Sequence, residues 1–483
     1  MRLLILLPVL TFAFMAFADL TTEWSYYYGA DDNEEVNSIV LKDNGNFLTA
    51  GLTESYGFGE FGKPDVYLVE LDEYGTVIWE KTFGVADTFE TAYHMLKTED
   101  SGYLMAGYKC GQWGFGDGDA ILFKVDSLGN EEWFRQFGGS DDEGFKFIIP
   151  SPAGGYIACG WTRSYGAGFV DAWVMKLDSS GNTEWSSPYG GTEYDVAKNV
   201  YPLSDGGYLV IGYTNSQGAG DRDAWVFKID ADGTMLWEKT FGGEGYDVVY
   251  YSTPTSDDSF VITGMVEDGP AMARWVFKID SSGNLLWEKA YDKEAGDDEG
   301  HYIEETSDNG LVIAAWAGHN GSPWTQMWIV RLDDMGEMLW DSAYGGAASD
   351  CANVVRQLNA TDYILGGTTL SYGAGRVDMW LMKLHDNQTG IEGDIVTEES
   401  MFTCYPNPCT ASAVFSFEMV QPDYVSISLF DHSGRAVATV FNGFLDAGIQ
   451  SVPFNTLDLC NGLYYARMET GELVQQEKII VLR

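Results

Sequence analysis

Short apolar runs punctuated by Gly and Asp recur through most of the chain. The run at 208–214 reads Tyr-Leu-Val-Ile-Gly-Tyr-Thr, and the run at 223–230 reads Asp-Ala-Trp-Val-Phe-Lys-Ile-Asp. Both are rich in the β-branched and aromatic residues that favour strands, and a Gly-rich loop separates them. The second run is apolar on both faces, as expected for a strand packed between two neighbouring sheets. The pattern predicts a chain built from short antiparallel strands.

A tryptophan marks a repeat of this pattern at spacings of 50 to 55 residues. The seven marker residues are Trp24, Trp79, Trp133, Trp185, Trp237, Trp287 and Trp340. Each copy holds about four strand-like runs, and a four-stranded unit repeated at this period is typical of a propeller blade. The sequence therefore predicts an all-β protein with a seven-bladed β-propeller over residues 19–385.

The two ends of the repeat array predict that the ring closes. The array begins with a Trp-containing strand at 22–28 and finishes near Trp380 without one. The first strand can therefore complete the last blade. An open solenoid would instead need polar caps at its ends, and the sequence contains none.

The repeat resembles secreted bacterial propellers of the β-propeller-repeat and delta-60 type, and more loosely the quinoprotein-like propellers. The resemblance covers residues 22–385 and is carried by Gly-Gly-Tyr-Ile/Leu turns, Asp-Ala-Trp-Val strands and Gly-x-x-x-Trp hairpins, as in Gly181 to Trp185. It implies that each marker Trp docks on the next blade. The Asp-box of sialidases places Trp five residues after its Asp. Here Asp178 and Trp185 are seven apart, so sialidase chemistry is not expected.

The N-terminus has the pattern of a secretory signal peptide over residues 1–18. Arg2 precedes an apolar run over 3–17, and small residues stand at the minus-three and minus-one positions of a cleavage site between Ala18 and Asp19. An uncleaved anchor is the alternative. No later apolar stretch approaches 20 residues, so the mature chain is expected to lack a transmembrane segment.

A polar linker at 386–402 precedes a C-terminal region whose sequence pattern differs from the repeat. Short alternating strands in 403–483 predict a small Ig-like β-sandwich. This region resembles the type A C-terminal sorting domain of type IX secretion substrates. The matching residues are Pro406, Asn407, Pro408, Gly434, Arg435, Gly462, Tyr464, Lys478 and Arg483. The resemblance implies the type IX machinery as partner, passage through the periplasm, and release or attachment at the outer surface. A structural sandwich packed on the propeller is the alternative.

The charge balance excludes several partners. The chain has 27 Lys+Arg and 73 Asp+Glu, with a net charge of -46 and a pI near 4.1. Such a surface repels phosphate backbones and anionic lipids, so no nucleic-acid binding is expected. Residues 19–402 hold 22 basic and 65 acidic side chains, a net of -43. The acidity therefore belongs to the propeller.

Propeller geometry collects two sets of loops on one side of the disc, the first face. These are the loops after each marker Trp, which are acidic, and the Gly-rich loops between second and third strands. The acids include Glu34, Asp142, Glu143, Asp195 and Asp350. Aromatic rings amid carboxylates suit stacking on sugar rings and hydrogen bonding to their hydroxyls. The predicted ligand-binding residues are Tyr56, Trp113, Tyr165, Trp324 and Tyr372. In the alternative, the acids keep the disc soluble and the rings pack their own loops.

Calcium is the one cofactor that the sequence makes a candidate. Carboxylates attract this ion, and the pairs are Asp117 with Asp119 and Asp221 with Asp223. An equivalent Asp precedes the third strand in five copies, at Asp65, Asp119, Asp171, Asp223 and Asp378. Two copies lack it, so turn capping explains it better than a ring of metal ligands.

Catalytic motifs are mostly missing, which favours a non-enzymatic binding protein for glycans or other surface polymers. One rival is a secreted polysaccharide hydrolase, an endoglucanase-like glycoside hydrolase with a carboxylate pair on the first face. Another is a structural or adhesive surface protein. His94, His301 and His319 occur once each rather than in every copy, so packing is favoured over a role as base. His301 is aligned with Phe145 of the third copy.

Overall fold

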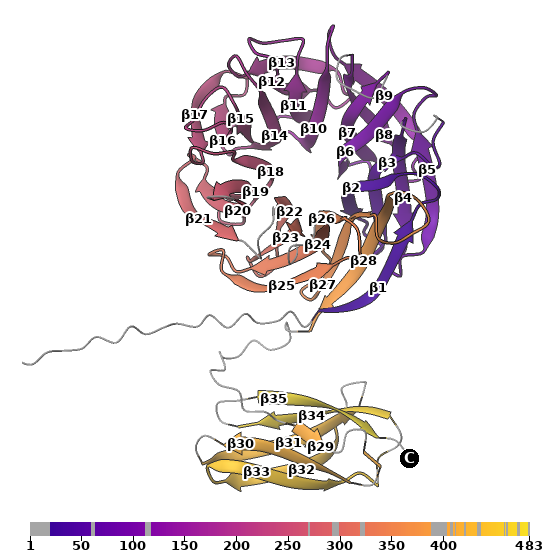
Figure 1. Ribbon diagram of the computed structural model, residues 1–483, viewed down its shortest axis with the longest axis vertical. Helices are drawn as coiled ribbons and strands as arrows, with labels where there is room; N and C mark the ends of the chain where they lie inside the picture. Colours follow the sequence, from indigo (N-terminus) through magenta and orange to yellow (C-terminus); the bar gives the residue numbers. More distant parts are fainter. Residues whose placement is uncertain are drawn as a thin grey trace, which may run out of the picture. The chain divides into compact units, whose positions relative to one another are not determined.

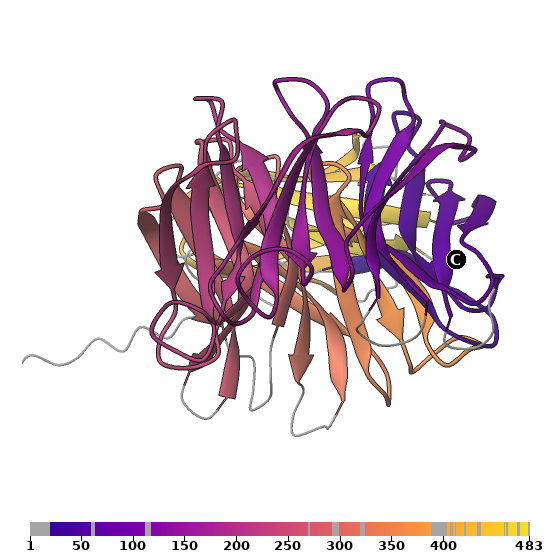
Figure 2. The same cartoon turned by 90° about the horizontal axis from the view of Figure 1, so that it is seen from above.

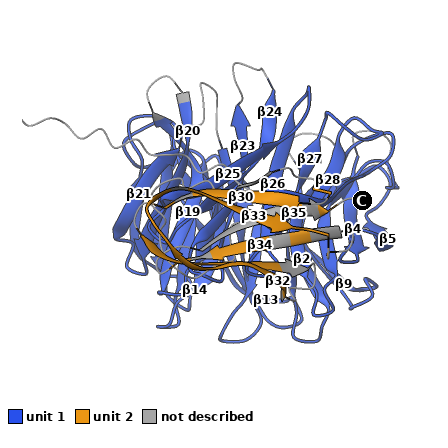
Figure 3. Cartoon of the chain, turned by 90° about the horizontal axis from the view of Figure 1, so that it is seen from below, with its two compact units in different colours: residues 1–389 blue, residues 390–483 orange. Residues whose placement is uncertain are grey.

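The computed structural model describes residues 20–58, 63–111, 117–268, 271–291, 299–318 and 324–387, and parts of 403–481 (403–405, 409–410, 412–419, 422–431, 436–457, 459, 462–470 and 474–481). The chain divides into two compact units, residues 1–389 and 390–483 (Figure 3). Every described element is a β-strand.

The first unit contains seven four-stranded antiparallel sheets arranged as blades in a ring (Figure 1). Blade 1 comprises β2 (Glu34–Leu41), β3 (Phe47–Thr53), β4 (Asp65–Leu71) and β5 (Val77–Phe83), and blade 2 comprises β6 (Phe89–Lys97), β7 (Tyr103–Cys110), β8 (Asp119–Val125) and β9 (Glu131–Phe137). Blade 3 comprises β10 (Glu143–Pro150), β11 (Tyr156–Thr162), β12 (Asp171–Leu177) and β13 (Thr183–Tyr189), and blade 4 comprises β14 (Asp195–Pro202), β15 (Tyr208–Thr214), β16 (Asp223–Ile229) and β17 (Met235–Phe241). Blade 5 comprises β18 (Val248–Pro254), β19 (Ser259–Asp268), β20 (Ala271–Asp280) and β21 (Leu285–Tyr291), and blade 6 comprises β22 (Glu299–Glu305), β23 (Leu311–Gly318), β24 (Thr325–Leu332) and β25 (Met338–Tyr344). Blade 7 comprises β26 (Asp350–Gln357), β27 (Asp362–Thr369), β28 (Asp378–Asp386) and, from the start of the chain, β1 (Leu20–Tyr28).

The ring is closed by the first strand, as the repeat array predicts. β1 pairs antiparallel with β28, so that Trp24 lies opposite Lys383 and Tyr28 opposite Met379. The last blade thus combines the two ends of the repeat array. This pairing gives the last blade the fourth strand that its own repeat lacks.

The marker tryptophans join neighbouring blades. Each lies on an outer strand, and six of them pack on a hairpin glycine of the next blade; a Cβ at Gly129 would lie 2.6 Å from the ring of Trp79. Gly129 has a φ of 72°, a left-handed conformation that favours glycine. Trp24 and Trp185 also donate their indole N–H to the backbone oxygens of Glu73 and Ala231. The structural role implied by the quinoprotein resemblance is therefore confirmed.

The core lies between the blades and is richest at the third strands. Every residue of β4 and β12 is buried, because each strand has a neighbouring sheet on both faces. Trp225 and Phe277 are among the largest fully buried side chains. Figure 2 shows the blade strands spanning the disc between two sets of loops, one of which is the first face.

The second unit is a two-sheet β-sandwich, as predicted. One sheet contains β29 (Thr403–Tyr405), β30 (Ser412–Met419) and β33 (Gly448–Asn455). The other contains β31 (Asp423–Asp431), β32 (Ala436–Leu445), β34 (Gly462–Glu469) and β35 (Val474–Val481). Phe415 and Phe417 of the first sheet share a core with Ile427, Met468 and Ile479 of the second.

Candidate ligand pocket in the propeller channel

The innermost strand of every blade contains a β-bulge at the same place. In blade 3 the pairing register shifts between Phe145 and Phe147, and in blade 4 between Ala197 and Asn199. A bulge leaves one residue unpaired and re-aims its side chain. The seven bulged residues, named here the bulge ring, are Asn37, Tyr93, Lys146, Lys198, Tyr250, His301 and Asn353. All seven line one small cavity of about 150 Å³, the floor cavity.

A larger cavity of about 800 Å³, the channel pocket, opens toward the first face beside blades 2, 3 and 4. Its wall includes the starts of the inner strands, for example Asp142 and Tyr194, together with first-face loop residues such as Phe169 and Arg222. It shares Tyr93, Lys146 and Lys198 with the floor cavity, so the two are continuous along the inner strands. Its volume is that of a site for a sizeable small molecule.

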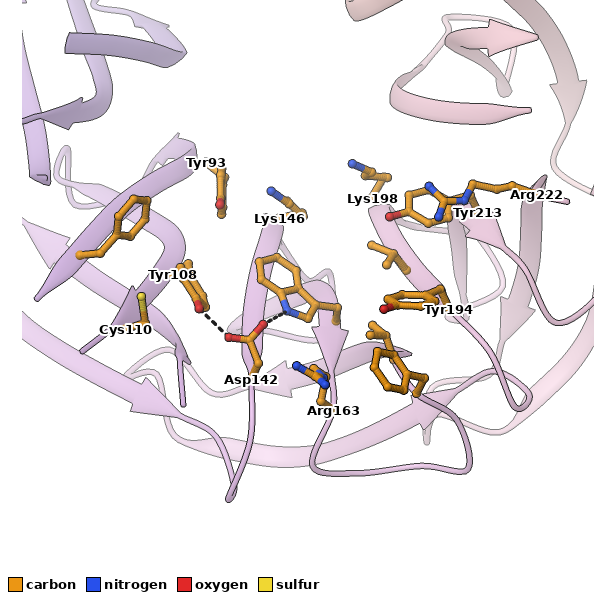
Figure 4. A pocket seen from close by; sticks show the side chains of 15 residues that line it. Tyr93, Tyr108, Cys110, Asp142, Lys146, Arg163, Tyr194, Lys198, Tyr213 and Arg222 are labelled. Carbon is orange, nitrogen blue, oxygen red and sulfur yellow. Dashed lines mark hydrogen bonds between the residues drawn. The ribbon is translucent and has the colours of Figure 1, made fainter. Parts of the chain in front are cut away.

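Basic and aromatic side chains dominate the lining of the channel pocket (Figure 4). The basic residues are Lys146, Arg163, Lys198 and Arg222, and the aromatic residues are Phe89, Tyr93, Tyr108, Trp161, Phe169, Tyr194 and Tyr213. Lys146 and Lys198, from neighbouring blades, both point toward the centre of the ring. Asp142 is the one carboxylate among the described lining residues.

The two lysines contact ring faces rather than carboxylates. Lys146 Nζ lies 3.2 Å from the ring centroid of Tyr93 and 5.1 Å from that of Trp161. Lys198 Nζ lies 5.3 Å from the Tyr250 ring centroid. Within the described parts of the chain, neither lysine has a carboxylate within 4 Å. Such pairing with the π face attracts a cation but leaves its charge uncompensated.

The two lysines are costly to protonate in this position. Burial, with the nearby Lys198, holds the pKa of Lys146 well below its ordinary value. Burial also lowers the pKa of Lys198 to about 8, and Arg222 adds to the shift while Glu299 opposes it. A bound anion would compensate both charges and reverse these shifts.

The remaining polar groups hold the wall in place. Asp142 accepts hydrogen bonds from Tyr108 Oη at 2.5 Å and from Trp161 Nε1 at 3.2 Å, which fixes both rings at the pocket (Figure 4). The Arg222 guanidinium stacks against Tyr213, with 4.4 Å between Cζ and the ring centroid, and donates Nε–H to Asn215. Arg163 is paired with Asp141 at 3.6 Å. The wall is therefore preorganised.

The predicted ligand-binding aromatics stand elsewhere on the first face. Tyr56, Tyr165 and Tyr372 are 41 to 44% exposed, and each donates its hydroxyl to a glycine carbonyl of the adjoining post-Trp loop: 3.1 Å to Gly29, 2.9 Å to Gly138 and 3.0 Å to Gly345. Trp324 is 48% exposed, and Trp113 lies outside the described residues. None of the four described rings lines either cavity, so ligand binding by them stays a prediction.

The described acids of the first-face loops include both exposed and buried residues: Asp31, Asp87, Glu193 and Glu244 are exposed. Seven others, including Glu34, Glu143, Asp195 and Asp350, are at most 2% exposed. Glu143 accepts hydrogen bonds from Thr162 Oγ1 and from the backbone N–H groups of Ser164 and Gly139, at 2.7 to 2.9 Å. These carboxylates tie the post-Trp loop to the end of the second strand, because a buried carboxylate needs several donors.

The calcium candidate Asp223 caps a loop, whereas Asp119 accepts a hydrogen bond from Gln136 Nε2 on β9. Asp223 Oδ2 accepts from Gly220 N at 3.2 Å, and the equivalent Asp171 accepts from Gly168 N at 2.9 Å. Asp117 and Asp221 are exposed. Among described residues the group of acids and histidines compact enough for a metal is Glu23, Asp362 and His385, where the Lys383 ammonium already lies 2.8 Å from Glu23. Calcium binding stays a prediction.

The alignment of His301 with Phe145 is wrong, because the bulge places His301 at the position of Lys146. His301 nevertheless packs, stacked between Tyr250 and Trp316 with centroid distances of 4.6 and 4.1 Å. Burial lowers its pKa. His94 packs on Phe147 at 4.2 Å, and His319 lies outside the described residues.

The bulge ring was missed by reading the sequence, although a signal for it exists. Each member follows its marker Trp by 13 or 14 residues, and each is polar or ionisable within a mostly apolar strand. The residue type changes from blade to blade, so a search for a repeated motif passes over the position. A search for a repeated place with changing chemistry would have found it.

The signal cleavage residues Ala18 and Asp19 lie outside the described residues, as do Pro406, Asn407, Pro408, Gly434, Arg435 and Arg483. Gly462 begins β34 and Lys478 lies on β35. Tyr464 is buried in the sandwich core.

Residues 403–482 match the family of secretion system C-terminal sorting domains. The C-terminal unit is thus a type IX sorting domain, and the protein is exported for attachment to the cell surface or release. No curated protein matches the chain. No helix with the length and apolar character to cross a membrane occurs in the part that the structure describes.

Solved structures similar to this chain include PorZ, an essential surface component of the type IX secretion system of Porphyromonas gingivalis. It is 14% identical with a TM-score of 0.45, and the match covers 94% of this chain but 59% of PorZ. A PL25 ulvan lyase is 9% identical, with 73% of this chain and 95% of the lyase covered and a TM-score of 0.46. The β-propeller domain of the trilobed protease from Pyrococcus furiosus is 11% identical, with 67% and 88% covered and a TM-score of 0.33.

Proposed function

We propose that this exported propeller is a binding protein for anionic surface polymers, acidic glycans in particular, which enter the channel pocket from the first face. The observation that carries the proposal is the pair Lys146 and Lys198, held in the channel against aromatic rings with no carboxylate counter-ion within 4 Å among the described residues. Burying two lysine side chains without a carboxylate partner costs free energy, so their presence points to a ligand that supplies the negative charge.

The scarcity of basic residues strengthens this interpretation. The chain has 27 Lys+Arg against 73 Asp+Glu, yet the described lining of this pocket has four basic residues and one acid. An acidic exterior repels anions in general and a local cationic site overcomes this only at short range, which favours ligands that also stack on rings. Pyranose rings carrying carboxylate or sulfate groups combine both properties.

The pocket offers less to the rival functions. Glycoside hydrolysis needs two carboxyl groups across the scissile bond, and the described lining holds only Asp142, both of whose oxygens accept hydrogen bonds from the wall. A protein that only displays loops does not require two lysines in its channel without a carboxylate within 4 Å among the described residues.

Titration calorimetry of the full chain against uronate-containing, sulfated and neutral polysaccharides, with and without calcium, tests the proposal. We expect binding of acidic polymers alone, weakened as salt rises. Equal binding of neutral and acidic polymers, or no binding of any, would contradict it. Release of reducing ends from the same panel would instead support the hydrolase.

A further inference from the structure

The floor cavity lies beyond the channel pocket along the inner strands and is far smaller. Its 150 Å³ corresponds to about five water molecules, against about 800 Å³ for the pocket above it. Tyr93, Lys146 and Lys198 belong to both cavities and therefore stand at their junction. An acidic group that reached this junction would meet two ammonium groups at once.

Aromatic side chains contact one another from blade to blade beside the floor cavity. His94 of blade 2 packs on Phe147 of blade 3 at 4.2 Å, and Phe147 lies 6.0 Å from Tyr251 of blade 5. Tyr251 stacks on Tyr302 of blade 6 at 4.2 Å. Contacts between ring centroids thus run from blade 2 to blade 6, and such spacing leaves no width for a sugar chain to pass between them.

The side of the ring near blade 7 is tied together by polar contacts. Asn353 Nδ2 donates to Val36 O at 3.0 Å, and Asn37 Nδ2 donates to Ala92 O at 3.0 Å. Arg356 donates Nη1–H to Ile39 O at 3.0 Å and pairs with Glu304. These bonds link neighbouring inner strands, so this side is braced against widening.

We infer that the channel is a blind site that recognises an end of its ligand: a terminal uronate residue enters first, and its carboxylate lies between Lys146 and Lys198 at the mouth of the floor cavity. The preceding sugar units occupy the channel pocket against Trp161, Tyr194 and Tyr213. The inference rests on the proposed function. It adds that internal units of a long polymer are not bound, because a continuous polymer chain cannot pass the floor cavity.

Oligogalacturonates provide the probe. The full chain is titrated with di-, tri- and tetragalacturonate and with polygalacturonate of known mean length. We expect affinity per chain end to be the same for the tetramer and the polymer, with one protein bound per end. Many proteins bound along each polymer chain, with weak competition by oligomers, would overturn end recognition while leaving anion binding intact. No binding of any of these acids would overturn both.

Two matched variants test the assigned lysines. Lys146→Met and Lys198→Met keep most of the unbranched side chain without its charge, and each is expected to weaken tetragalacturonate binding by about tenfold or more. Lys289→Met is the control, since Lys289 pairs with the exposed Glu337 on an outer strand. Thermal unfolding of each variant checks the fold. Unchanged affinity in both folded channel variants would overturn the inference.

Discussion

Blades 7 and 1 use the bulge position in one way, and blades 3 and 4 use it in another. In blades 7 and 1 the bulged residues are Asn353 and Asn37, whose amides donate to backbone carbonyls of the next blade. In blades 3 and 4 they are Lys146 and Lys198, which lie against aromatic rings and have no carboxylate within 4 Å among described residues. The backbone device is the same on both sides of the ring.

The difference separates structure from function within a single repeat. An asparagine at the bulge donates a hydrogen bond to a backbone carbonyl of the neighbouring blade and stabilises the ring. A lysine at the same place gains no comparable partner and is held with a depressed pKa. The bulge position has hydrogen-bond partners within the protein in blades 7 and 1, but it lacks a comparable partner in blades 3 and 4. This difference marks blades 3 and 4 as the part of the ring where a ligand completes the site.

The largest effect is expected from giving blades 3 and 4 the asparagine that blades 7 and 1 have at the bulge. The double variant Lys146→Asn/Lys198→Asn removes both charges from the junction and should weaken binding of acidic oligosaccharides by about 100-fold, the loss of two charge-assisted contacts. Its midpoint of thermal unfolding should rise, because two mutually repelling, desolvated cations are gone. Calorimetry and thermal unfolding measure the two quantities. Normal binding by this variant would show that the bulged lysines do not differ in function from the bulged asparagines.

The pH dependence of binding follows from the same lysines. Burial lowers the pKa of Lys198 to about 8 in the free protein, so this group loses its charge between pH 7 and 9. We expect affinity for a uronate oligosaccharide to fall by about tenfold over this range. In the absence of ligand the contribution of Lys198 to stability changes in the opposite direction. The unfolded chain holds this proton up to about pH 10.4 and the native state does not, so stability rises from pH 8 upward.

Removing the structural asparagine tests the other side of the comparison. Asn353→Ala deletes the hydrogen bond to Val36 O at the junction of blades 7 and 1 and should lower the free energy of unfolding by about 1 kcal/mol. Affinity for acidic oligosaccharides should not change. Denaturant unfolding with parallel calorimetry measures both. A loss of affinity without a loss of stability would place Asn353 in the ligand site instead.

The fold could be predicted from the sequence much further than the site could. The marker tryptophans, the third strands and the unpaired first strand all follow local rules of period and patterning, so the blades and their closure could be read directly. The pocket depends on which residues seven separate bulges bring to one axis. Lys146 and Lys198 lie 52 positions apart, and no local pattern reports that they share a cavity or lack acids.

The acids of the first-face loops also show how little of the site could be predicted from the sequence. The alternative that these acids keep the disc soluble would place them at the surface, whereas Asp195 is buried and accepts hydrogen bonds from Gly191 N and Ser216 Oγ. Composition counts charges without saying which of them face water. A carboxylate at the start of a buried strand holds the adjoining loops together because neighbouring Ser and Thr hydroxyls and backbone N–H groups donate to it.

The smallest effect is expected where two such carboxylates meet between blades. A Cβ at Gly190 would lie 2.6 Å from Asp171 Oδ1 and 2.5 Å from Asp195 Oδ2, so these acids face each other across the glycine. Burial raises the pKa of Asp171, and Asp195 adds to the shift. A raised native pKa means that stability from this group is present at acid pH and is lost as pH rises through that value. Asp171→Asn should therefore be more stable than the parent at pH 7, by less than about 0.5 kcal/mol, and the gain should vanish near pH 3.5. Denaturant unfolding at both pH values measures the difference. A gain that persisted undiminished at pH 3.5 would show that the benefit does not come from removing the charge of Asp171, because the raised pKa of Asp171 favours its protonated form at acid pH.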